Sequence, residues 1–183
     1  MRTFKLILYA CLIAVLAHFT YYLATDYQTF PGRAHMPFVL WTIDTIDLFI
    51  HEAGHLVFRI FGRLLYFMGG SLFQIIIPAA AVIVFGKNNL RTLPFTLYWM
   101  GQSTVNVSIY IGDAPYQQLR LISRHLLHDW HWIFQRLDMM EDAETVASLV
   151  NIFGILLCTA GLGIGLWFVF KDIREIIAEN FKS

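Results

Sequence analysis

Charged side chains are scarce in this sequence of 183 residues, where they make up 14% while hydrophobic residues make up 57%. A soluble domain usually carries about a quarter charged residues, so this chain has too little charge to cover a water-facing surface. It also lacks an excess of basic residues, since 13 Lys and Arg balance 13 Asp and Glu, which argues against nucleic-acid binding. These absences favour an integral membrane protein with membrane lipid as a partner and no nucleic-acid partner.

Cysteine is nearly absent as well. The two cysteines, Cys11 and Cys158, both lie inside apolar runs. The sequence therefore indicates neither a disulfide framework nor a cysteine-based zinc site, and we expect both to be small apolar side chains in lipid.

Five stretches are long and apolar enough to cross a bilayer, which takes roughly 20 residues. We therefore predict an all-α, polytopic integral membrane protein with about five transmembrane helices, the second of which carries a zinc motif. The whole chain, residues 1–183, is expected to form a single membrane domain. The predicted spans cover residues 4–23, 38–65, 68–85, 93–111 and 145–170, with a polar, interfacial loop at 112–144 and a short tail at 171–183.

The span count and the basic residues bear on orientation. Five spans place the two chain ends on opposite sides of the membrane. Lysine and arginine divide nearly evenly between the two sides, so the sequence indicates no orientation in the membrane.

The second span contains His51-Glu52-Ala53-Gly54-His55, which fits the pattern His-Glu-x-x-His. Residues four apart share a helix face, so both imidazoles can bind one Zn²⁺, and Glu52 can take a proton from the metal-bound water. Random placement of the histidines and glutamates of this chain would produce the pattern only about 0.007 times, and ionisable groups inside a membrane are usually functional. We predict Zn²⁺ as cofactor, His51 and His55 as ligands and Glu52 as the catalytic base. The alternative is that both histidines are only hydrogen-bonded.

Further polar residues of the second span share a face with these histidines. Asp44, Asp47, His51 and His55 fall within about 80° of one another, and the opposite face is apolar. Asp47 lies one turn before His51, where its carboxylate can accept the other ring N–H and fix the tautomer. Alternatively, Asp44 and Asp47 face a water-filled vestibule or pair with an arginine.

A catalytic zinc site normally has three protein ligands and one open position, so a third ligand is needed. The fourth span has a polar face that needs a polar partner inside the membrane, and the histidine face of the second span is the expected one. Asp113 is the predicted third ligand, unless it simply ends the span at the water boundary. Gln102 and Asn106 are placed to hold substrate or to support the ligands. The full polar face consists of Gln102, Asn106, Tyr110 and Asp113.

The polar loop offers competing third ligands. Residues 129–137 are expected to form a short interfacial helix, because their tryptophans and phenylalanine suit the headgroup level. His128 and Asp129, at its start, are the alternative third ligands. His125, His128 and His131 recur every three residues, but their helical offsets spread over about 120°, so all three cannot bind one ion.

With these residues in view, the sequence resembles the site-2 protease family of intramembrane zinc metalloproteases. That family follows its His-Glu-x-x-His helix with a later span bearing an Asn and an Asp, and the Asp completes the zinc site. The resemblance covers residues 38–113 and implies zinc-dependent hydrolysis of a peptide bond in or near a membrane segment, by a multi-pass protein of a bacterial-type cell membrane. The matching positions are His51, Glu52, His55, Asn106 and Asp113.

Two other functions remain open. The chain could be a non-proteolytic membrane protein that binds zinc for structure or regulation, or a zinc hydrolase of a lipid or another amphiphile. Glu52 favours an enzyme, because a structural site needs no base, but it does not distinguish a peptide from a lipid substrate. We expect a membrane protein or peptide as substrate, and the sequence leaves its identity and the oligomeric state undetermined.

Overall fold

The protein is built almost entirely of helices. The computed structural model describes residues 2–27, 36–119 and 128–181, and no strand occurs within these ranges. Short 3₁₀ turns, η2 (Arg59–Phe61), η3 (Leu90–Thr92) and η4 (Met140–Asp142), connect the longer elements. The α-helices are α1 (Arg2–Thr25), α2 (Phe38–Phe58), α3 (Arg63–Asn88), α4 (Leu93–Gly112), α5 (Asp129–Leu137) and α6 (Ala143–Asn180).

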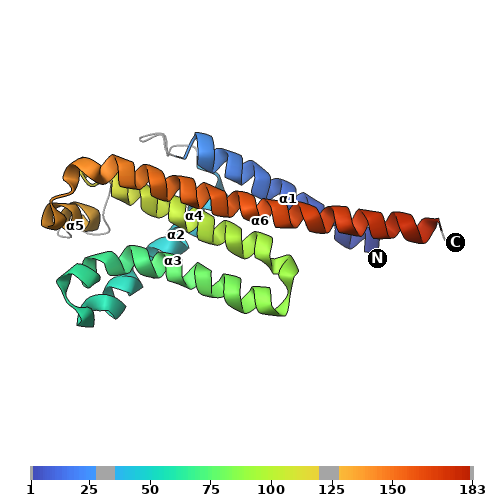
Figure 1. The fold of residues 1–183 in the computed structure, drawn as a ribbon, viewed down its shortest axis with the longest axis horizontal. Helices are drawn as coiled ribbons and strands as arrows, with labels where there is room; N and C mark the ends of the chain where they lie inside the picture. The colour runs from blue at the N-terminus through green and yellow to red at the C-terminus, as the bar shows by residue number, and fades with distance from the viewer. Residues whose placement is uncertain (1, 28–35, 120–127, 182–183) are drawn as a thin grey trace.

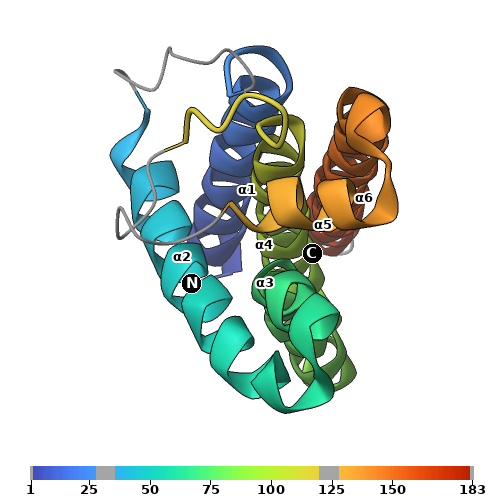
Figure 2. The same cartoon turned by 90° about the vertical axis from the view of Figure 1, so that its left-hand side faces the viewer.

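The helices α1, α3, α4 and α6 run along the long axis of the molecule, while α2 crosses them obliquely and α5 lies across one end (Figures 1 and 2). Helix α4 occupies the centre, where all residues from 101 to 108 are buried. Its polar side chains therefore face neighbouring helices, and this enclosed position brings them next to α2.

Both ends of the described chain lie at the end of the bundle away from α5 (Figure 1). Ion pairs join Arg2 at the start of α1 to Glu175 and Glu179 near the end of α6. The expectation that the chain ends lie on opposite sides is therefore not met. The physical reason is that α2 runs obliquely, which leaves α1, α3, α4 and α6 to alternate in direction along the axis.

Three of the described helices are long and apolar enough to cross a membrane, namely α1, α3 and the continuous helix Met140–Asn180. This agrees with a membrane protein, but the predicted count of five spans is not confirmed. Two of the three other α-helices, α2 and α4, carry most of the polar residues of the predicted site. Their polar residues lower the hydropathy of both helices, and the fold accommodates them by burying the polar faces.

Helix boundaries differ from the predicted spans in two places. The second span was expected to reach residue 65, but α2 ends at Phe58, and Gly62 breaks the chain direction with φ +97°, a conformation that favours glycine. The predicted tail at 171–183 is instead mostly helical, because α6 continues to Asn180. The predicted short helix at 129–137 is confirmed as α5.

Candidate metal centre

The two histidines of the motif lie on the inner face of α2. His51 and His55 are 4% and 8% exposed, and their ring centroids are 4.8 Å apart. The opposite face of α2 is apolar and exposed, with Phe49 at 70% and Leu56 at 71%. The predicted division of this helix into a polar inner face and an apolar outer face is therefore observed.

Close packing of α3 against α2 puts the histidines in a confined space. A Cβ atom added at Gly54 of the motif would collide with the backbone of Gly69 on α3, so the two helices can approach only because both positions are glycine. A Cβ at Gly70 would likewise collide with the imidazole of His51. The imidazole of His51 thus fills space that any larger residue at position 70 would occupy.

A carboxylate from another part of the chain meets both histidines. Asp129, the first residue of α5, places its Oδ2 3.0 Å from Nε2 of His51 and 3.2 Å from Nε2 of His55. The ligand atoms of these three residues all lie within 4.8 Å of one another, a group that could hold a metal ion.

The ring nitrogens that face away from this group have their own partners. Nδ1 of His55 lies 2.8 Å from the backbone carbonyl oxygen of Tyr66, and Nδ1 of His51 lies 3.2 Å from Oε1 of Gln74. A carbonyl oxygen only accepts hydrogen bonds, so each Nδ1 carries the proton and each Nε2 is left with a lone pair. This is the usual tautomer of metal-binding histidines, whose second nitrogen donates to a neighbouring oxygen.

A chain of hydrogen bonds fixes the orientation of the Gln74 amide. Asn106 donates from Nδ2 to the hydroxyl of Tyr27 at 2.8 Å, and that hydroxyl donates to the carboxylate of Asp44 at 2.8 Å. With its amide nitrogen used in this way, Asn106 presents Oδ1 to Gln74, which donates to it from Nε2 at 2.8 Å. The Oε1 of Gln74 is thereby left to face His51. This series of hydrogen bonds thus connects Asp44 with His51, two residues of α2, and it fixes the orientation of the amide that contacts the imidazole.

Aromatic side chains enclose the two imidazoles. Tyr110 of α4 stacks on His51, with centroids 5.6 Å apart, and the ring of Tyr66 lies 5.0 Å from that of His55. Contacts with α3 hold α5, and with it Asp129, in place. Trp130 donates from its indole to Ser71 at 3.0 Å, and Trp132 stacks on Phe67 with centroids 4.3 Å apart.

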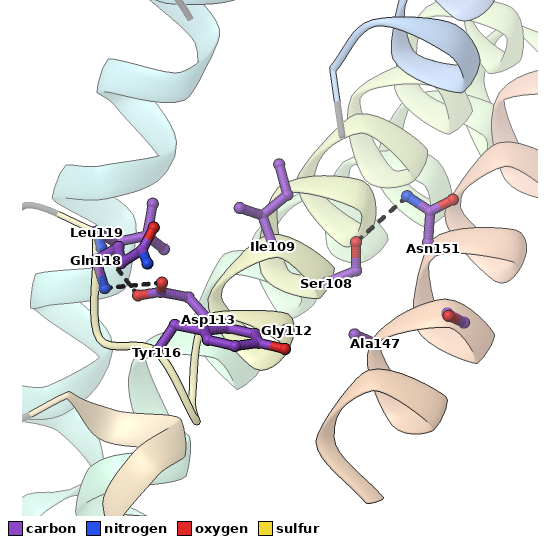
Figure 3. A pocket seen from close by; sticks show the side chains of 10 residues that line it. Ser108, Ile109, Gly112, Asp113, Tyr116, Gln118, Leu119, Ala147 and Asn151 are labelled. Carbon is purple, nitrogen blue, oxygen red and sulfur yellow. Dashed lines mark hydrogen bonds between the residues drawn. The ribbon is translucent and has the colours of Figure 1, made fainter. Parts of the chain in front are cut away.

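The predicted third ligand, Asp113, occupies a different place. Its two carboxylate oxygens accept hydrogen bonds from the backbone N–H groups of Gln118 and Leu119, each at 2.9 Å, so it caps the turn after α4. It lines a cavity of about 380 Å³ between α4, the following turn and α6 (Figure 3). Among the described residues, the carboxylate that the structure brings to the two histidines is therefore Asp129, the alternative ligand, rather than Asp113.

The other described histidines of the polar loop, His128 and His131, do not join this group. Nδ1 of His128 lies 3.7 Å from the Asp113 carboxylate, and Nδ1 of His131 lies 2.8 Å from the carbonyl oxygen of Ala114. His125 lies outside the described residues. His128, the other alternative ligand, thus faces the residue that caps the turn and not the histidine pair.

The remaining predicted residues support the surroundings of the site. Asp47 is fully buried, but it accepts hydrogen bonds from Trp99 at 3.1 Å and Ser103 at 2.9 Å. The partner of His51 that we expected in Asp47 is instead Gln74. Gln102 donates to Asp44 at 2.6 Å, while Asn106 accepts from Gln74 and donates to Tyr27, each at 2.8 Å, so both amides have partners within the protein.

Two partners of the histidines were missed in the sequence. Gln74 carries a signal, because an amide in the middle of an apolar membrane helix needs a buried partner. Tyr66 carries none, since it contributes only a backbone carbonyl oxygen, which every residue has. Glu52, the predicted base, follows His51 directly and is partly exposed.

Comparisons with protein-family models, curated proteins and solved structures find no match to this chain. Any statement about function therefore depends on the chemistry and geometry of the residues themselves.

Proposed function

We propose that the protein is a zinc metalloendopeptidase of the membrane, similar to the site-2 proteases, which hydrolyses peptide bonds in or near membrane segments. One observation carries the proposal. Nε2 of His51 and Nε2 of His55 converge on a single oxygen of Asp129, while the opposite nitrogen of each ring donates to a fixed acceptor. Such an arrangement is typical of a metal site whose histidines are held in one tautomer.

The donor set fits zinc. Two imidazoles and one carboxylate are a common ligand set of catalytic zinc sites, which leave the fourth position open. Zinc–ligand distances of about 2.0–2.1 Å in a tetrahedron separate neighbouring ligand atoms by about 3.3 Å. The distances from Asp129 Oδ2 to the two Nε2 atoms, 3.0 and 3.2 Å, are close to that value.

Glu52 favours a catalytic role of the metal site over a structural role. A zinc ion at this site supplies the Lewis acidity that makes water a nucleophile near neutral pH. Glu52 takes the proton of the attacking water and returns it to the leaving amine as the peptide bond breaks. His51, His55 and Asp129 hold the ion, and Gln74 and Tyr66 keep the two imidazoles oriented.

The surface around the site supports a substrate that lies in the membrane. Phe49 and Leu56, on the outer face of α2, are 70% and 71% exposed, and Ile60, on the following turn η2, is 82% exposed. We place this face against lipid, with α1, α3, α4 and α6 crossing the bilayer and α2 lying obliquely in the half that contains α5. In this arrangement a membrane segment reaches the site by lateral diffusion.

The test uses the full-length protein in detergent, with its metal content and its activity measured separately. In Glu52→Gln, bound zinc is expected to stay near one per chain, while peptide cleavage falls by about 10²–10⁴-fold, the usual contribution of a general base. The substrates are membrane-segment peptides and, in parallel, phospholipids, each with added zinc or with a chelator.

The outcomes separate the candidate functions. Zinc-dependent cleavage of peptides by the wild type, but not by Glu52→Gln, supports the protease. Zinc-dependent hydrolysis of lipid alone would replace it with a lipid hydrolase. Bound zinc without either activity would favour a structural role, for which the burial of His51 and His55 and the link between α2 and α5 also speak. Full activity of Glu52→Gln would refute Glu52 as the base.

A further inference from the structure

The turn between α2 and α3 combines two exposed arginines with a prominent apolar surface. Arg59 and Arg63 flank Gly62, and both are exposed. On the same turn, Ile60 is 82% and Phe61 59% exposed. Exposed apolar side chains next to cations are typical of a surface at the boundary between lipid tails and headgroups.

No carboxylate within the described ranges forms an ion pair with either arginine. The guanidinium of Arg63 lies over two rings instead, with its Cζ atom 5.0 Å from the centroid of Trp132 and 5.9 Å from that of Phe67. A contact with a ring face holds the cation in position but leaves its in-plane N–H groups available. Both arginines therefore have unused capacity for an anion.

The two arginines also share a cavity. It measures about 440 Å³, and Gly62 contributes an open edge, because a Cβ atom there would meet no atom within 4 Å. One wall is apolar and the other is cationic. The cavity is lined by Leu56, Arg59, Gly62, Arg63, Tyr66 and Phe67.

We propose that this cavity binds the phosphate group of an anionic phospholipid, with Arg59 and Arg63 on the phosphate and the acyl chains along Leu56 and the outer face of α2. Guanidinium groups bind phosphate through paired N–H donors, and two of them without an ion pair to a described carboxylate favour a lipid with net negative charge. A zwitterionic lipid would bring its own cation against the arginines. The binding places this turn at the headgroup level and does not depend on the metal.

A second cavity at the other end of the molecule provides a matched control. It measures about 450 Å³ and is also lined by two cations, Lys171 and Arg174, but Glu175 lies in the same lining. Removing two positive charges there changes the net charge by the same amount, and Glu175, which forms an ion pair with Arg2, adds a negative charge to this lining. Specific lipid binding is therefore expected at Arg59 and Arg63 and not at this second cavity.

The test is native mass spectrometry of the full-length protein in detergent, titrated with phosphatidylglycerol, with phosphatidylcholine or with inorganic phosphate. The wild type and Lys171→Gln/Arg174→Gln are expected to bind one phosphatidylglycerol with equal affinity. Arg59→Gln/Arg63→Gln is expected to bind it about 25-fold more weakly, at about fivefold for each arginine near a membrane surface. Phosphatidylcholine is expected to bind more weakly than phosphatidylglycerol to the wild type, and inorganic phosphate not to displace the lipid.

Three results would overturn the proposal. These are equal losses in the two double variants, equal binding of both lipids, and displacement of the lipid by inorganic phosphate, which would indicate a site for free anions. If Arg59→Gln/Arg63→Gln does not fold, the proposal is tested by the salt dependence of lipid binding to the wild type. Its affinity for phosphatidylglycerol must then fall as sodium chloride rises, and an affinity independent of salt contradicts the arginine contacts.

Discussion

Two groups of buried or half-buried polar side chains lie along the same face of α2, and they differ in how their atoms are matched. The ligand cluster consists of His51 and His55 with Asp129 from α5. The carboxylate cluster consists of Asp44 and Asp47, about two turns earlier on the helix. In the carboxylate cluster, neutral donors meet the oxygens, since Trp99 and Ser103 bond to Asp47, and Tyr27 and Gln102 bond to Asp44.

The ligand cluster is arranged in the opposite way. Its outer nitrogen atoms are satisfied by Gln74 and Tyr66, and its inner atoms, two Nε2 and one carboxylate oxygen, face one another. Without a metal ion, neutral histidines in this tautomer would place three hydrogen-bond acceptors, the two Nε2 atoms and the Asp129 oxygen, in contact with no donor between them. Burial of polar residues alone therefore does not separate the two clusters, whereas the matching of donors with acceptors does.

The largest effect is expected from the two aspartates that competed for the third ligand position. Asp129→Ala should weaken zinc binding by more than about 100-fold, because even groups that only support a ligand cost about 10–100-fold. Asp113→Ala should leave zinc bound and destabilise the turn after α4 by about 1 kcal/mol, the value of a typical hydrogen bond. Zinc per chain, measured after dialysis of both purified variants, tests this. Loss of zinc in Asp113→Ala alone would show that the metal lies elsewhere.

A smaller effect is expected from variants of the residues whose hydrogen bonds link the two clusters. Gln74→Ala removes the acceptor for Nδ1 of His51 and should lower zinc affinity by about 10–100-fold, as loss of such a partner usually does. Asn106→Ala acts one hydrogen bond further away and should have a weaker effect in the same direction. Competition with a zinc chelator measures both. Equal affinity of Gln74→Ala and wild type would mean that the amide does not orient the histidine.

The smallest effect is expected within the carboxylate cluster. Ser103→Ala removes one donor to Asp47 and should lower the free energy of unfolding by about 1 kcal/mol, as hydrogen bonds between membrane helices commonly do. Zinc affinity should not change, because Ser103 makes no contact with the ligand cluster. Thermal unfolding in detergent and the chelator titration measure the two quantities. A change in the zinc affinity of Ser103→Ala would show that the carboxylate cluster influences metal binding, and it would contradict a purely structural role for that cluster.

The properties of α2 that depend on local periodicity could be predicted from the sequence. The spacing of four between His51 and His55 places them on one face of any helix, and the apolar residues that alternate with them define the exposed face. The short helix that carries Asp129 was predicted because its tryptophans and phenylalanine suit the headgroup level of a membrane. The buried partners of Asp47, by contrast, come from α4, and no local pattern pairs one with the other.

The number of membrane-crossing helices depends on how the helices are arranged. An apolar run of about 20 residues is long enough to cross a bilayer, but it does not reveal its tilt. The oblique course of α2 follows from its close glycine contact with α3 and from the turn at Gly62, which are tertiary features. The predicted count of five spans, which was based on length, therefore stays unconfirmed.

By itself, the amino-acid sequence determined that the chain is helical, belongs in a membrane and presents two histidines and a glutamate on a single helix. Those properties arise from composition and from the repeat of the helix, which act over a few residues. Only the tertiary structure decided that Asp129 and not Asp113 meets the histidines, and that Gln74 and Tyr66 orient them. These partners are separated by 78, 23 and 11 residues in the chain, and helix packing, which acts across such separations, brings them together.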